Sequence, residues 1–374
     1  MKNKILLLCF FAAIFSPSGI DLYIALIPTI SELYNVNSEF ALSSYILGMA
    51  IGTVFSGFLY DKYGGIRLLK WASMLLLITC VFIARTNDFN TLLFLRLIQG
   101  IVISPFMLSA LSIIKDNMEE QQVGPIYGKI NGFMNLIPMF FPSLSILILN
   151  HSQQWQTVFV FFAAIAFSFF SFTSLAFREK QIKWNVESNA PINKILNDQH
   201  YRKFSAFPIL SLSLIFMYCS FSPTVITDLL NWDILSYSFY FGFNGILMFI
   251  SGQFLGSLFF KYGSKTVLKL GFILALLSSL LLIFSFISAY FVLIGLSFYT
   301  ISFIFIISSS HALSLSTLKS GIGKANGIIS CLQMLLGAIL SALTGLLSNG
   351  EIIFFFSLAI ILMALCGIKI IRGK

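Results

Sequence analysis

Two residues of opposite charge, Asp21 and Arg96, lie inside long apolar stretches of this sequence. If those stretches cross a membrane, each charge costs roughly 3 kcal/mol, so such residues are usually functional. Burial favours the neutral acid and a nearby cation favours the carboxylate, so Asp21 is suited to bind and release a proton. Arg96 cannot lose its proton and needs a partner, for which Asp21 is a candidate. The alternatives are an Asp21 in water near the outer interface and an Arg96 bonded to backbone carbonyls.

Further polar and aromatic residues inside the apolar stretches are candidates to line a substrate cavity: Tyr23, Gln99, Asn135, Tyr218, Asn244 and Gln333. Polar groups that face lipid are costly, so most of these side chains are expected to point inward. Gln99 follows Arg96 by about one helical turn and shares its face. Whether each residue binds substrate or joins two helices stays open.

The composition shows which elements must position these residues. Of the 374 residues, 58% are hydrophobic and only 10% are charged, whereas soluble proteins carry roughly 25% charged residues. This excludes soluble, disordered and fibrous classes and indicates an all-α membrane protein. The five cysteines show no pairing or metal-ligand spacing. No nucleotide loop, metal set or nucleophile motif is present, so neither an enzyme nor a bound cofactor is expected.

Runs of about 20 apolar residues are long enough to cross a bilayer as helices. The sequence contains twelve such runs, at 5–30, 40–60, 69–86, 90–114, 123–149, 154–177, 203–229, 233–259, 266–286, 288–314, 322–347 and 351–371. With a cytoplasmic N-terminus, all of the 23 basic residues except Arg85 and Arg96 fall on the inside. The net charge of +9 is therefore a topology signal and indicates no nucleic-acid partner. It predicts a multi-pass protein of the cell (inner) membrane with both termini in the cytoplasm.

The chain divides into two halves of six spans. We predict a bundle over 1–177, a cytoplasmic linker over 178–202 with a short helix around 191–199, and a second bundle over 203–374. Residues 57–64 (GFLYDKYG) and 256–263 (GSLFFKYG) match at a constant offset of 199 positions. Such a repeat indicates two related bundles that rock about a central site.

Five motifs in this order and topology resemble the major facilitator superfamily, and within it the twelve-span drug/proton antiporters of the bicyclomycin and chloramphenicol resistance branch. They are Gly57-x-x-x-Asp61-Lys62-x-Gly64-x-x-Arg67, Asp21-Leu-Tyr-x-x-x-x-Pro28, Arg96-Leu-Ile-Gln-Gly100, Ser222-Pro223, and Gly323-Lys-Ala-Asn-Gly327 with Gln333. The resemblance implies a monomeric transporter driven by a proton gradient, in which the arginine matching Arg96 is tied to proton transfer. The fifth span departs from the antiporter pattern because bulky residues surround Pro138 and Pro142.

A cytoplasmic gate is predicted at Gly57, Asp61, Lys62, Gly64 and Arg67. Asp61 is expected to lie against a helix N-terminus in the opposite half, where the dipole favours an anion. The resemblance places that N-terminus near 321–324. The alternative is a basic loop with a local Asp–Lys pair. In the second copy of the repeat Phe260 replaces the acid, so the same contact cannot form there.

The functional hypothesis is a secondary active transporter that exports small apolar or drug-like molecules in exchange for protons, by alternating access within the lipid bilayer. A second hypothesis keeps the fold but assigns it to the export or import of one metabolite, such as a siderophore, a sugar or an amino-acid derivative. A third is a membrane sensor or partner protein that transports nothing. The spans hold too few charged groups to bind a highly charged solute, which favours the first hypothesis.

Overall fold

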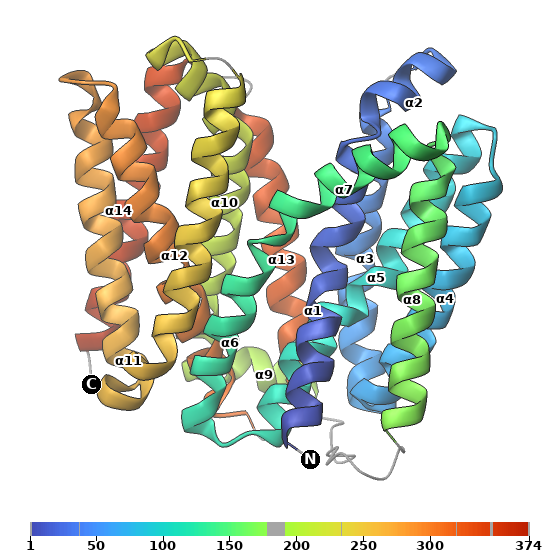
Figure 1. Ribbon diagram of the computed structural model, residues 1–374. Coiled ribbons are helices and arrows are strands. Elements are labelled where there is room, and N and C mark those ends of the chain that lie inside the picture. The colour runs from blue at the N-terminus through green and yellow to red at the C-terminus, as the bar shows by residue number, and fades with distance from the viewer. Residues whose placement is uncertain are drawn as a thin grey trace. The chain divides into compact units, whose positions relative to one another are not determined.

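The computed structural model describes residues 2–36, 38–177, 191–232, 234–318, 320–344 and 347–372. These residues form helices and no strand, as the predicted all-α class requires. The helices (Figure 1) are α1 (Lys2–Ile24), α2 (Ile27–Tyr34), α3 (Glu39–Tyr63), α4 (Gly65–Arg85), α5 (Phe89–Asn117), α6 (Glu120–Met134), α7 (Ile137–Ser152), α8 (Gln156–Ala176), α9 (Ile192–Asn197), α10 (Gln199–Leu230), α11 (Ile234–Ile283), α12 (Tyr290–Ser316), α13 (Ile322–Thr344) and α14 (Asn349–Arg372).

Ten helical segments of the described residues are long and apolar enough to cross a membrane. One of them, Phe239–Phe286, contains Gly263 at a φ of 76°, where two helices meet inside α11. The span predicted at 123–149 is divided between α6 and α7. Pro138 lies in the first turn of α7, where its missing N–H does no harm to a new helix. The multi-pass membrane fold is confirmed, whereas the number twelve stays a prediction.

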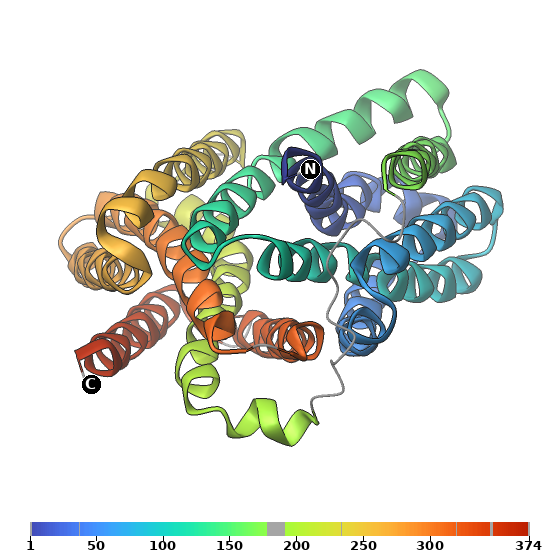
Figure 2. The same cartoon turned by 90° about the horizontal axis from the view of Figure 1, so that it is seen from below.

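One compact unit, unit 1, contains Met1–Met118, Ile137–Ile195 and Leu318–Cys331. In it α5, the helix that carries Arg96, packs against α1, α3 and α4. Figure 2 views the helices from below. The carboxylate of Asp88 fixes the start of α5 by accepting hydrogen bonds from Thr91 N and Oγ1, both at 2.7 Å. The same hydrogen bonds hold the pKa of Asp88 below its ordinary value.

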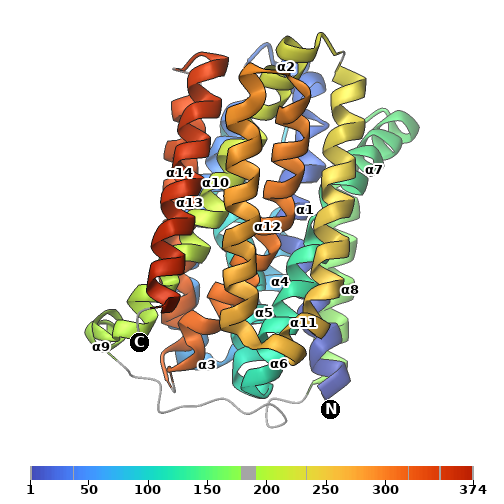
Figure 3. The ribbon, with the colours of Figure 1, turned by 90° about the vertical axis from the view of Figure 1, so that its left-hand side faces the viewer.

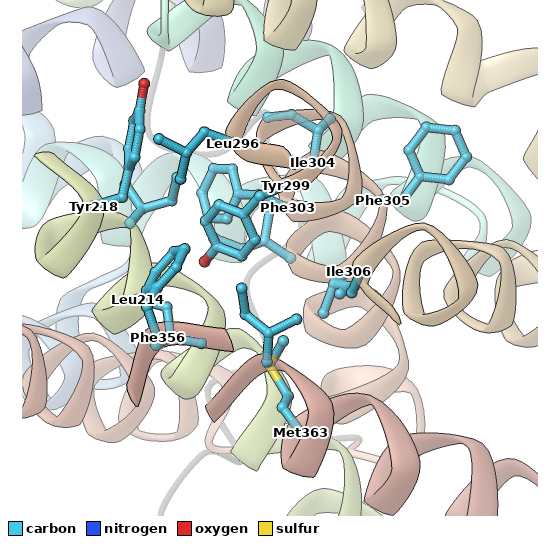
Figure 4. Close-up of a cluster of buried hydrophobic side chains, with 14 of the residues drawn as sticks. Leu214, Tyr218, Leu296, Tyr299, Phe303, Ile304, Phe305, Ile306, Phe356 and Met363 are labelled. Carbon is cyan, nitrogen blue, oxygen red and sulfur yellow. The ribbon is translucent and has the colours of Figure 1, made fainter. Parts of the chain in front are cut away.

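The other compact unit, unit 2, contains Glu119–Leu136, Leu196–Thr317 and Leu332–Lys374. In it α12 packs against α10 and α11, α14 packs against α11 and α10, and α6 lies against α11 and α12 (Figure 3). The core of unit 2 is aromatic and aliphatic: Tyr299 and Phe356 meet edge to face at 4.9 Å between ring centroids (Figure 4). In the same view Tyr218 directs its hydroxyl away from the other labelled side chains.

The two compact units do not coincide with the two sequence halves. Helix α6 belongs to the first half but groups with unit 2, and the start of α13 belongs to the second half but groups with unit 1. The domain boundaries at 177 and 203 stay predictions. Residues 178–190 of the linker lie outside the described residues, and the short helix predicted after them is present as α9.

Candidate functional site

Arg96 is fully buried in unit 1, with 0% of its surface exposed. Its two terminal nitrogens each donate to the carbonyl oxygen of Gly19 at 3.2 Å, and Nη1 also donates to Gln99 Oε1 at 2.6 Å. The guanidinium lies over the rings of Tyr23 at 4.4 Å and Tyr45 at 4.2 Å. A backbone carbonyl, a side-chain amide and two aromatic faces therefore surround this cation. This agrees with the alternative considered from the sequence, in which Arg96 binds backbone carbonyls.

Close helix packing brings these groups together. A side chain at Gly100 would overlap the backbone carbonyl of Tyr45, and one at Gly48 would overlap that of Leu97, so α3 and α5 touch through their backbones. A side chain at Gly19 would overlap the hydroxyl of Tyr45. Small residues at helix contacts allow this approach. They place one tyrosine ring between α1 and the Arg96 guanidinium.

Asp21 is buried, with 7% of its surface exposed, and its Oδ2 has no hydrogen-bond partner among the described residues. It lies two residues from both Gly19 and Tyr23, which is about 200° around a helix. Since Gly19 and Tyr23 both contact Arg96, Asp21 faces another side of α1. The direct Asp21–Arg96 pair considered from the sequence is absent, because Arg96 binds the backbone beside Asp21 instead.

Two of the predicted cavity residues belong to the packing around Arg96. Gln99 is 0% exposed and donates from Nε2 to Cys80 Sγ at 3.2 Å while accepting from Arg96. Tyr23 is also 0% exposed, and its hydroxyl donates to Ser38 O at 2.9 Å. Both side chains position other groups in this structure and present no surface to a ligand.

Asp61 lies at the N-terminus of α13, inside unit 1. Its Oδ1 accepts from the backbone N–H of Gly323 at 2.9 Å, and its Oδ2 accepts from that of Lys324 at 3.1 Å. The contact expected near 321–324 is therefore present, and Asp61 is only 6% exposed. Unsatisfied N–H groups and the dipole make a helix N-terminus a good anion site.

The other predicted gate residues shape this contact. A side chain at Gly57 would come within 2.6 Å of Gly323 O, so α3 and α13 touch through backbone. Gly64 ends α3 at a φ of 82°, which favours glycine. Lys62 is exposed with its Nζ 5.1 Å from the Tyr63 ring centroid, and Arg67 is partly buried on α4.

Neighbouring polar pairs tie α5 to the same region of unit 1. The hydroxyl of Tyr60 donates to Asp116 Oδ2 at 2.6 Å. From α13, Asn326 Nδ2 donates to Ser112 Oγ at 2.6 Å. Sequence reasoning missed both pairs because no local motif links residues that are 56 and 214 positions apart.

In unit 2 the remaining predicted residues are mostly helix-to-helix contacts. Asn244 Nδ2 donates to Tyr218 OH at 3.4 Å, and Asn244 Oδ1 accepts from Thr300 Oγ1 at 3.4 Å. Gln333 Nε2 donates to Pro208 O at 2.9 Å. Asn135 is partly exposed and donates to Asn131 O at 2.6 Å beside the end of α6. Asn244, Tyr218 and Gln333 are buried, so only Asn135 of these four has appreciable exposed surface.

The described residues contain no group of three or more His, Cys, Asp or Glu side chains that could hold a metal ion. Buried Asp and Arg side chains are confined to unit 1 in the described part of the chain: Asp21, Asp61 and Arg96. The arrangement therefore offers one unpaired acid, one buried cation and one acid on a helix terminus.

The family model of the Major Facilitator Superfamily matches residues 9–342. Among curated proteins, Multidrug resistance protein MdtL of Shewanella oneidensis is 24% identical over 92% of this chain and 90% of its own length. The MdtL of Shewanella sp. (strain ANA-3) is 24% identical over 63% of this chain and 61% of its own length, so this chain spans only about three fifths of that relative. The Uncharacterized MFS-type transporter YdgK of Bacillus subtilis is 24% identical over 89% of this chain and 86% of its own length.

Solved structures show the same fold at low sequence identity. FucP in the outward conformation has a TM-score of 0.78 at 14% identity, over 98% of this chain and 96% of its own. The proton:xylose symporter XylE has a TM-score of 0.76 at 14% identity, over 99% of this chain and 96% of its own. At this identity the likeness establishes the fold alone.

Proposed function

Because this chain belongs to the major facilitator superfamily of membrane transporters, we propose that it exports small apolar or drug-like molecules in exchange for protons. The observation that carries the proposal is Asp21, a buried carboxyl group in a span whose Oδ2 has no partner among the described residues. A carboxylate in this position lacks the hydrogen bonds that stabilise its charge, so it gains from binding a proton. The multidrug relatives, at 24% identity, support the class of substrate.

Arg96 contributes through the backbone of α1. Its hydrogen bonds to Gly19 O fix the turn that precedes Asp21, and its packing against Tyr23 fixes the turn that follows. A movement of α5 is thereby transmitted to both sides of the proton-binding residue. This gives Arg96 a role in coupling although it forms no ion pair with Asp21.

The Asp61 contact supplies the gate of the proposed cycle. With two charge-assisted hydrogen bonds to α13, it stabilises the state in which the cytoplasmic side is closed. Charges at helix termini contribute about 0.3–1 kcal/mol, and up to about 2 kcal/mol when partly buried. That is enough to bias an equilibrium between two conformations and small enough to be broken in each cycle.

The energy source in this proposal is the proton gradient. One proton that crosses the full membrane potential supplies about 2.3 kcal/mol per 100 mV. At about 1.4 kcal/mol per factor of ten, this supports a substrate gradient of roughly 50-fold per 100 mV. The described interior holds few charged groups besides Asp21 and Arg96, so an apolar substrate suits it best.

The test is proton movement in vesicles that contain the purified protein and a trapped pH-sensitive dye. We expect compounds from a panel of apolar drugs and dyes to change the luminal pH only when the protein is present. Asp21→Asn should reduce this signal at least 100-fold, since an amide cannot exchange a proton, while the protein remains folded and monodisperse.

Glu32→Gln is the matched control, because Glu32 is an exposed acid of α2, and it should transport at the wild-type rate. If Asp21→Asn still drives uphill transport at that rate, the coupling role of Asp21 is wrong. If no drug moves protons but a single sugar or amino-acid derivative does, the protein is a dedicated metabolite transporter.

A further inference from the structure

The repeated segments 57–64 and 256–263 adopt the same backbone turn. Gly64 ends the first copy at φ 82° and ψ 153°, and Gly263 ends the second at φ 76° and ψ 161°. The offset of 199 positions continues elsewhere: Gly124 and Gly128 of α6 correspond to Gly323 and Gly327 of α13. The α3–α13 contact in unit 1 and the α6–α11 contact in unit 2 are therefore two copies of one arrangement.

Both copies place a buried aromatic ring on the first of these glycines. In unit 1 a side chain at Gly323 would lie 2.8 Å from Tyr60 Cδ1, and in unit 2 one at Gly124 would lie 2.6 Å from Phe259 Cε1. Tyr60 is 4% exposed and Phe259 is 5% exposed. The ring-on-glycine contact is thus the part of the arrangement that the two copies share.

The two copies differ in where their acidic residues lie. Asp61 binds the N-terminus of α13, which has no acidic residue in its first turn. The position that corresponds to Asp61 is Phe260, whose side chain is 66% exposed. Helix α6 instead carries its own acid, Glu120, in its first turn, with Glu119 preceding it. An acid near the positive end of a helix offsets the dipole locally, so α6 needs no carboxylate from α11.

The α6–α11 contact is also close along its length. A side chain at Gly132 would lie 3.0 Å from the Cα of Gly252, and one at Gly128 would lie 2.8 Å from Leu255 Cδ1. Backbone therefore packs on backbone, with Phe259 at the end nearest the start of α6. Such packing depends on close shape complementarity, so a change of ring size or of Gly124 is expected to disturb it.

We propose that Phe259 seated on Gly124 is a second cytoplasmic latch, which closes α6 against α11 through an aromatic contact. It corresponds to the Asp61 latch but has Phe260 at the position of the acid. The inference rests on the alternating-access transport proposed above, in which the cytoplasmic side opens and closes. It assigns the buried Phe259 a conformational function that its exposed neighbour Phe260 does not have.

The test measures how readily buried cysteines on each seam react with a membrane-impermeant maleimide from the cytoplasmic side. The five native cysteines are replaced by serine, and the reporters are Ser251→Cys on α11, near the α6 contact, and Thr53→Cys on α3. Ser251 is 8% exposed and Thr53 is 4% exposed, so both label slowly in the closed state.

We expect Phe259→Ala to raise the labelling of both reporters at least fivefold, because opening the cytoplasmic side exposes both seams. Phe259→Tyr, which restores the residue type of the first copy, should stay within twofold of the parent. Gly124→Val, which displaces the ring, should act like Phe259→Ala. Phe260→Ala is the matched control and should change nothing. Size-exclusion profiles establish that each variant is folded.

If Phe259→Ala and Gly124→Val fold but label at the parent rate, the latch does not exist. If Phe260→Ala labels as fast as Phe259→Ala, the effect is not specific to the seated ring and the proposal is wrong. Asp61→Asn tests the other latch independently. Should Asp61→Asn leave labelling unchanged while Phe259→Ala raises it, the gating role of Asp61 fails and the aromatic latch stands.

Discussion

The interiors of unit 1 and unit 2 differ in the kind of polar group that they bury. Unit 1 buries Arg96, Asp21 and Asp61. A backbone carbonyl and aromatic faces contact Arg96, and backbone amides donate to Asp61. Among its described residues, unit 2 buries no Asp, Glu, Lys or Arg; its polar contacts are neutral, as between Asn244 and Tyr218. The two compact units therefore bury different kinds of polar group.

This difference in buried polar groups leads us to expect different functional roles for the two units. A buried charge is costly and is usually functional where it is retained, which agrees with the proton coupling that we propose for unit 1. Neutral hydrogen bonds and rings cost less to bury, so we expect substitutions in unit 2 to affect proton coupling less than substitutions in unit 1. The following predictions test that expectation.

Substitution of Arg96 should have the largest effect. Arg96→Lys keeps the charge but loses the planar fork that reaches Gly19 O and Gln99 together. We expect a loss of about 3 kcal/mol in stability, in line with the cost of breaking buried charged contacts, and transport at least tenfold slower. Thermal unfolding in detergent and the vesicle assay measure both.

Arg85→Lys is its control, since Arg85 is exposed at the end of α4, and it should be unaffected. An Arg96→Lys protein with wild-type stability and transport would show that the guanidinium contacts are dispensable. The buried charges of unit 1 would then not explain a functional difference between the units.

Asn244→Leu should have an intermediate effect in unit 2. It removes the amide that joins Tyr218 to Thr300 while keeping a similar volume. We expect the KM for an apolar substrate to change about fivefold, in line with one or two neutral hydrogen bonds of about 0.5–1.5 kcal/mol each. The number of protons moved per substrate should stay constant, and a changed ratio would place proton coupling in both units.

Tyr45→Phe should have the smallest effect. The Tyr45 hydroxyl is buried without a partner in the described residues, so its removal relieves a desolvation cost. We expect unchanged or slightly higher thermal stability and transport within twofold of wild type. Tyr45→Leu, which also removes the ring over Arg96, should lower stability by about 1–2 kcal/mol. Loss of transport in Tyr45→Phe alone would instead place that hydroxyl on the proton path.

Much of the fold could be predicted because its physical signals are local in the chain. Runs of apolar residues set the spans, and turn residues such as Gly64 mark their ends. The Asp61 contact was also within reach, because an acid beside a basic loop is visible in the sequence and the family resemblance pointed to the helix start near 321–324.

Other features of the site could not be predicted because they depend on which helix faces meet. Gln99 and Tyr23 were expected beside a cavity, yet both pack around Arg96. The Asp21–Arg96 pair was suggested by opposite charges inside two predicted spans, but the rotation of α1 presents Gly19 to the guanidinium instead. Nothing in the local sequence near Tyr45 indicates that its ring lies over Arg96.

The amino-acid sequence alone determined that this chain crosses a membrane many times, is helical and repeats a motif in its two halves, because the cost of burying charge and backbone in lipid leaves few other solutions. Tertiary structure alone decided which polar groups meet. Helix rotation and glycine contacts put Arg96 on a carbonyl, left the Asp21 Oδ2 unpaired, and seated Phe259 on Gly124. Those choices depend on packing between residues far apart in the chain, where periodicity carries no information.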